Sequence, residues 1–139
     1  ETRETADHSL PYITAIALID GEVTEKQFQP KRFMDPAIWK FLENVTVQRN
    51  DELTSLYAKA VANIVHVTLQ DGHVLTKRVD HPLGNAFNPV SDEQLEGKFN
   101  ALVVPALGEE GAQKLVAAGW KLDEAKNPNE LMKLAKMPT

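Results

Sequence analysis

Four histidines are the side chains in this sequence best able to transfer a proton near neutral pH: His8, His66, His73 and His81. We interpret His66 and His73 as exposed edge positions of a hairpin, and His81 as a structural loop residue. His8 differs because it lies beside Ser9 at the expected start of an apolar helix, where backbone N–H groups and the helix dipole favour an anion. An imidazole there can bind a carboxylate or transfer a proton. The alternative interpretation is a histidine that caps the helix or satisfies a polar group.

Other catalytic and metal-binding patterns are missing from the sequence. The histidines have no spacing such as H-E-x-x-H, and no cysteine is present to complete a zinc site or to act as a nucleophile, so we predict no metal site. No serine lies in a G-x-S-x-G elbow, and the Gly84-Asn85 pair lacks the glycine spacing and the lysine of a phosphate loop. The lack of cysteine is compatible with a reducing cytoplasm.

The composition is that of a soluble globular protein with one modest core. The chain has 139 residues, of which 42% are hydrophobic and 25% are charged, and its net charge of −5 arises from interspersed acidic and basic residues. No basic stripe indicates a nucleic-acid surface. No apolar run approaches the roughly 20 residues that span a bilayer. We therefore expect neither nucleic acid nor membrane as a partner.

The first strong element is a helix that positions His8. Ser9 or Asp7 can cap its N-terminus, Pro11 is tolerated in its first turn, and Gly21 can end it in a left-handed conformation. Residues 12–19 are apolar almost all round, which is typical of a buried helix. A chain of this length offers that helix little cover. We therefore expect a further polypeptide segment, upstream of Glu1, to cover it and to hold most of the function.

Further helices are predicted from their start and stop signals. Capping boxes begin at Thr24 and Ser91, Asp35 precedes a proline as N-cap, and a short terminal helix is expected from Asn127 onwards. Gly108 is expected to separate two helices in the region that follows Ser91.

Strands are predicted in the middle of the chain. Residues 45–49 alternate apolar and polar side chains, as a half-buried strand does. Residues 63–69 and 73–79 flank Gln70-Asp71-Gly72, the strongest hairpin signal present. We expect a sheet that is covered on one side and partly covered on the other. Helices followed by a hairpin and more helices predict an α+β fold with a small antiparallel sheet packed by helices.

Three segments resemble the MmgE/PrpD family, whose members include 2-methylcitrate dehydratase. They are residues 6–24 (ADHSLPYITAIALIDGEVT), residues 67–72 (VTLQDG) and residues 88–99 (NPVSDEQLEGKF), and they occur in the family's order. The resemblance implies a cytoplasmic homodimeric enzyme in which an α+β lid domain is inserted into an all-helical domain. Residues 1–90 would then form the later part of the lid, and residues 91–139 the helices that return to the helical domain. The N-terminal helical domain itself would be missing.

The resemblance also implies a reaction class. Family activities include dehydration of 2-methylcitrate, decarboxylation of cis-aconitate and epimerisation of iminodisuccinate, all on small carboxylate substrates and without a metal or organic cofactor. We expect a 2-methylcitrate dehydratase-like lyase that acts on small tricarboxylates, of which this chain is a C-terminal fragment, inactive alone. The alternatives are a relative of the decarboxylase or epimerase, and a non-catalytic folding or dimerisation module of the same fold.

Candidate site residues follow from the same resemblance. Most catalytic groups are expected upstream of Glu1, and His8 is the one histidine in a matching segment, so we predict that it is catalytic. Ser9 and Asn85 are predicted to bind substrate. Many relatives carry Gly-His where this chain has Gly84-Asn85, and an asparagine can form hydrogen bonds but cannot shuttle a proton. This replacement is expected to alter the substrate or the activity.

Overall fold

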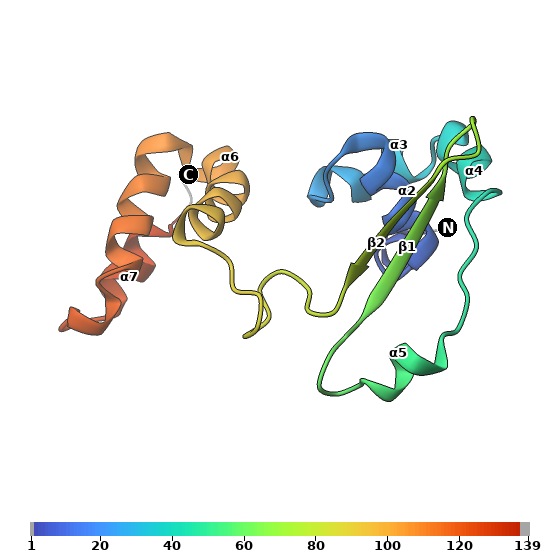
Figure 1. The fold of residues 1–139 in the computed structure, drawn as a ribbon. Coiled ribbons are helices and arrows are strands. Elements are labelled where there is room, and N and C mark those ends of the chain that lie inside the picture. The colour runs from blue at the N-terminus through green and yellow to red at the C-terminus, as the bar shows by residue number, and fades with distance from the viewer. Residues whose placement is uncertain (1, 137–139) are drawn as a thin grey trace. The chain divides into compact units, whose positions relative to one another are not determined.

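A computed structural model describes residues 2–136 of the chain (Figure 1). The chain divides into two compact units, Glu1–Ser55 and Leu56–Thr139. Within the described residues the fold is α+β, as predicted: helices and one two-stranded antiparallel sheet. No helix among these residues has the length and apolar character needed to cross a membrane.

The first unit consists of short helices. Their bounds are α1 Arg3–Asp7, α2 Leu10–Asp20, the 3-10 helix η1 Glu25–Phe28, α3 Pro30–Phe33, α4 Pro36–Leu42 and α5 Asp51–Ser55. The predicted ends of α2 are confirmed. The Ser9 hydroxyl oxygen accepts the backbone N–H of Tyr12 at 3.3 Å, and Gly21 adopts a left-handed φ of 73°.

The starts of η1 and α4 are set by local hydrogen bonds. The Thr24 N–H donates to Oε1 of Gln27 at 2.9 Å, which confirms the first capping box, and Oδ1 of Asp35 accepts the Ala37 N–H at 2.9 Å. Helices α1, α3 and α5 were not predicted. Helix α1 is capped by Thr2 but has no apolar periodicity that would reveal it.

One face of helix α2 packs into the core of the first unit. Tyr12 and Ile16 are buried with Phe33, Ile38 and Ala6, and the partly buried side chains of Phe28 and Leu42 pack against them. Burying one such large side chain stabilises a fold by about 1.5–3 kcal/mol. Other apolar residues of α2 remain exposed: Leu10, Leu18 and Ile19 are 49%, 48% and 45% exposed. The helices of this chain therefore cover α2 only in part, and the expected cover from a further segment stays a prediction.

The predicted strand at residues 45–49 is wrong. These residues have no regular secondary structure and connect α4 to α5, and Val47 is 57% exposed. A strand needs a partner that satisfies its backbone groups, and within residues 2–136 the two strands of the hairpin pair with each other. Alternation alone does not supply that partner.

The predicted hairpin is confirmed, but its predicted cover is not. Strands β1 (Asn63–Thr68) and β2 (Val74–Val79) pair with Asn63 opposite Val79 and Thr68 opposite Val74 (Figure 1). Every residue of β2 is exposed, and β1 is half-buried only at Ile64 and Val67. The expectation of one covered side is wrong because the alternation fixes which side chains share a face, whereas cover must come from another element.

The rest of the second unit is helical. It contains α6 (Asp92–Gly119), the 3-10 helix η2 (Leu122–Glu124) and α7 (Asn129–Leu134). Ser91 and Gln94 form the predicted capping box. Gly108, with φ 71° and ψ 170°, breaks α6 into two arms, as predicted. The Trp120 indole N–H donates to Oε1 of Glu96 at 2.6 Å, so the second arm folds back along the first. The domain division at residue 90 stays a prediction.

Candidate functional site

His8 lies at the junction of α1 and α2, where it is the C-cap residue of α1. Its Nδ1 is 2.5 Å from Oδ1 of Asp7 and 3.0 Å from the backbone oxygen of Glu4. Both neighbours are hydrogen-bond acceptors, so Nδ1 carries the proton in the neutral ring and Nε2 is the basic nitrogen. The side chain of His8 is 81% exposed, and that of Asp7 is 40% exposed. The ring is thus anchored at one nitrogen and accessible to solvent.

The same two contacts stabilise the protonated ring. The hydrogen bond to the Glu4 backbone oxygen, followed by the hydrogen bond and charge of the Asp7 carboxylate, raises the pKa of His8 above its ordinary value. The raised pKa increases the protonated fraction of the ring near neutral pH.

Ser9 is half-buried and acts as the N-cap of α2. Its oxygen is engaged by the backbone N–H of Tyr12. The hydroxyl proton can still be donated, and its role in binding substrate stays a prediction.

A polar network that includes Asp20 fixes helix α2. The Tyr12 hydroxyl donates to the backbone oxygen of Gln27 at 2.5 Å, and the Gln27 side chain donates to Asp20 at 3.1 Å. The guanidinium of Arg32 binds both carboxylate oxygens of Asp20 and donates to Asp35 at 2.8 Å. Arg32 lowers the pKa of Asp20 through these hydrogen bonds. The network joins the end of α2 to the start of α4, so the helix that carries Ser9 is held in place.

Sequence reasoning missed both Arg32 and the contact between Asp7 and His8. Arg32 reaches a carboxylate 12 residues away, and no local pattern signals such a pair. For the contact between Asp7 and His8, the only signal in the sequence was that the two residues are neighbours.

Asn85 belongs to the second unit, in the loop between β2 and α6. Its Oδ1 accepts the backbone N–H of Phe87 at 2.9 Å, and its own N–H donates to the oxygen of Pro82 at 3.0 Å. The His81 ring lies 5.0 Å from the Phe87 ring, in keeping with a structural loop residue. The structure brings His8 and Ser9 together as chain neighbours, whereas Asn85 lies in a separate unit, and its binding role stays a prediction.

The remaining histidines lie on the hairpin, as predicted. His66 and Thr76 face each other across the strands, with Nδ1 of His66 at 2.8 Å from the threonine hydroxyl. His66 and His73 are both exposed. In the part of the chain that the structure describes, no three His, Asp or Glu side chains are grouped so as to hold a metal ion.

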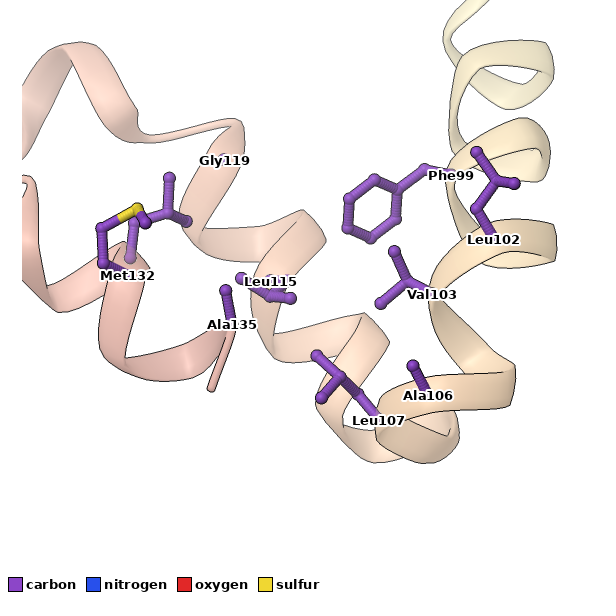
Figure 2. A pocket seen from close by; sticks show the side chains of 10 residues that line it. Phe99, Leu102, Val103, Ala106, Leu107, Leu115, Gly119, Met132 and Ala135 are labelled. Atoms are coloured by element: carbon purple, nitrogen blue, oxygen red, sulfur yellow. The ribbon is translucent and has the colours of Figure 1, made fainter. Parts of the chain in front are cut away.

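A cavity of about 400 Å³ lies between the two arms of α6 and helix α7 (Figure 2). Phe99 and Val103 of the first arm point toward Leu115 of the second. Only apolar residues and one glycine line it: Phe99, Leu102, Val103, Ala106, Leu107, Leu115, Gly119, Leu131, Met132 and Ala135. Such a lining offers no group for proton transfer or for binding a carboxylate, so the cavity is a packing surface rather than a reaction site.

Comparison with known proteins decides the family. A sequence profile of the MmgE/PrpD C-terminal domain matches residues 1–124. The chain belongs to the MmgE/PrpD family.

Curated relatives in this family are named for two lyase activities. The chain is 26% identical to the cis-aconitate decarboxylase of Mus musculus over 143 residues, which cover 100% of this chain and 28% of that protein. It is 30% identical to the Homo sapiens cis-aconitate decarboxylase, with 96% of this chain and 28% of that protein covered. A 2-methylcitrate dehydratase of Cupriavidus necator is 32% identical over 57% of this chain and 17% of its own length. The chain thus spans about a quarter of the length of the curated decarboxylases.

Proposed function

We propose that this chain is the C-terminal part of an MmgE/PrpD lyase that acts on small tricarboxylates in the cytoplasm. The observation that carries the proposal is the family match over residues 1–124, together with relatives named as dehydratases and decarboxylases. An exposed histidine next to the start of α2, with its Nδ1 hydrogen-bonded, supports it. Dehydration and decarboxylation of such acids both require a proton to be removed or delivered next to a carboxylate.

Two reactions are candidates within this class. We propose a 2-methylcitrate dehydratase-like reaction first, which removes water across two neighbouring carbons. A decarboxylation of the cis-aconitate type is the second candidate, and one observation favours it. The mammalian decarboxylases align with 100% and 96% of the chain, whereas the Cupriavidus dehydratase aligns with 57%.

In this proposal His8 is the proton-transfer residue that the chain contributes. Its Nε2 is the free basic nitrogen, since Nδ1 is engaged by Asp7 and Glu4. Ser9 and Asn85 donate hydrogen bonds to the substrate carboxylates from their hydroxyl and amide groups. The other catalytic groups are supplied by polypeptide that this chain does not contain.

The same missing polypeptide is proposed as the partner of this chain, within a homodimer. Exposed apolar side chains on α2, on both faces of the hairpin and along the helical cavity support this assignment. A two-stranded hairpin is marginal in water without further cover. Large exposed apolar surfaces commonly mark an interface.

The test is an assay of the full-length protein with 2-methylcitrate, citrate and cis-aconitate, in which products are separated and identified. We expect turnover of at least one acid, with an unsaturated product from dehydration or itaconate and carbon dioxide from decarboxylation. The 139-residue chain assayed alone is expected to be inactive. If the full-length protein converts none of the three acids, the proposal is refuted.

A further inference from the structure

The contact between Asp7 and His8 has a geometry that a catalytic histidine requires. Two acceptors, the Asp7 carboxylate at 2.5 Å and the Glu4 backbone oxygen at 3.0 Å, converge on a single ring nitrogen, Nδ1. A histidine that exchanges protons through Nε2 must carry its proton on Nδ1 when neutral. A base that is itself oriented by a third group is the recurring arrangement of proton-transfer sites.

We infer that Asp7 is a positioning residue for His8, which holds the ring in the Nδ1–H tautomer and presents Nε2 to the substrate. This inference rests on the proposed function, because it assigns a partner to the proton-transfer residue named there. Asp7 makes no contact with the reacting atoms in this assignment and acts through His8.

The need for such a partner follows from exposure. The His8 side chain is 81% exposed, so without anchors the ring would sample several rotamers and both neutral tautomers. Asp7 ends α1 and His8 is its C-cap residue, so both backbones are held by a helix that Thr2 caps. The residues that hold the His8 ring therefore belong to the same short helix, α1.

The polar and charged groups around His8 all favour its protonated form. The Glu4 carbonyl and the Asp7 carboxylate are its hydrogen-bond partners, and the carboxylate charge of Glu4 adds a smaller contribution. All three favour the protonated ring and raise the pKa of His8. Removal of the Asp7 charge should therefore lower that pKa, and proton transfer should shift to lower pH with it.

The first experiment uses nitrogen-detected NMR of the isotopically labelled 139-residue chain. In the unsubstituted protein we expect the pKa of His8 to lie above its ordinary value and the neutral ring to populate mainly the Nδ1–H tautomer. Asp7→Asn and Asp7→Ser should both lower the titration midpoint and increase the Nε2–H form, and Asp7→Glu should restore part of the effect. Asp71→Asn, which removes a carboxylate next to His73, is the matched control and should leave His8 unchanged.

The second experiment measures the pH dependence of kcat/KM in the full-length enzyme. His8→Ala should lower kcat/KM by about 10²–10⁴-fold, the usual contribution of a general acid–base group. Asp7→Asn and Asp7→Ser should lower it less and move the midpoint of the pH profile to lower pH. Circular dichroism confirms that each variant is folded, and the use of two substitutions covers the case in which one of them unfolds.

The outcomes separate the two proposals. If His8→Ala leaves kcat/KM unchanged, the proposed role of His8 in proton transfer is wrong. If His8→Ala lowers kcat/KM while the Asp7 variants keep the tautomer, the titration midpoint and the pH profile of the unsubstituted protein, the role of His8 stands and the inference about Asp7 is overturned.

Discussion

Ile16 and Ile38 of the first unit are 0% and 1% exposed, whereas Val74 and Leu75 of the hairpin in the second unit are 50% and 49% exposed. Both regions have strong local sequence signals: capped helices in one, and a hairpin turn flanked by β-branched residues in the other. The difference lies in what surrounds them. Helices α1, α3 and α4 enclose one face of α2, while β2 is exposed along its whole length. Local order and burial are therefore separate properties, and only burial contributes strongly to stability.

The largest expected effect tests this distinction within one helix. Ile16→Ala removes a fully buried side chain and is expected to lower the free energy of unfolding of the first unit by about 2–5 kcal/mol, because a cavity replaces packed atoms. Urea unfolding followed by the fluorescence of Trp39, in a Trp120→Phe background, reports this unit alone.

The matched control is Ile19→Ala, the same substitution at an exposed position near the C-terminal end of α2. Ile19 is 45% exposed, and its replacement should change the free energy of unfolding by less than about 1 kcal/mol. Equal losses for the two variants would show that Ile19 is also covered in solution, and the contrast between buried and exposed positions of α2 would not hold.

The second prediction concerns the break in α6. Gly108 has φ 71° and ψ 170°, a conformation that only glycine adopts readily, so Gly108→Ala should destabilise the folded-back arms by about 1–3 kcal/mol. Gly97→Ala should instead stabilise α6 by about 0.5–1 kcal/mol, since Gly97 is helical and an added methyl group meets no atom within 4 Å.

Thermal unfolding followed by Trp120 fluorescence, in a Trp39→Phe background, measures both glycine variants. Trp120 bonds to Glu96 across the two arms, so its emission reports whether they remain folded back. A Gly108→Ala variant as stable as the parent, with unchanged emission, would show that the break in α6 does not depend on the conformational freedom of glycine.

The smallest expected effect is a pH dependence of the free energy of unfolding of the first unit. Arg32 lowers the pKa of Asp20 in the folded state, so the stabilising contribution of Asp20 is complete above the ordinary carboxyl pKa and is lost as the pH falls through the lowered value. Asp20→Asn should therefore destabilise the unit near neutral pH and progressively less under acidic conditions. Glu22→Gln, an exposed carboxylate nearby, serves as control, and a constant difference between Asp20→Asn and the parent across acidic pH would refute this account.

Most of the fold was predictable where the deciding interactions are short-range. The Ser9, Thr24, Asp35 and Ser91 caps, the turn before β2 and the break at Gly108 all appear where the sequence predicts them. The strand predicted at residues 45–49 did not form, because its existence depended on a partner strand rather than on its own residues.

The candidate site was predictable in part. His8 and Ser9 were singled out by their place at a helix start, which the structure confirms, while their catalytic and binding roles stay predictions. The Asp7 contact with His8 was not recognised, since adjacent side chains meet only when the backbone between α1 and α2 turns in the observed way.

The sequence by itself determined the α+β class, four capped helix starts, the hairpin pairing and the family. These depend on interactions between residues close along the chain, or on patterns shared with relatives. Only the tertiary structure decided which face of α2 is buried, how Arg32 joins Asp20 to Asp35 and how Trp120 reaches Glu96. The physical reason is that burial and side-chain pairing across 12 or 24 residues depend on where whole elements pack, which no local pattern specifies.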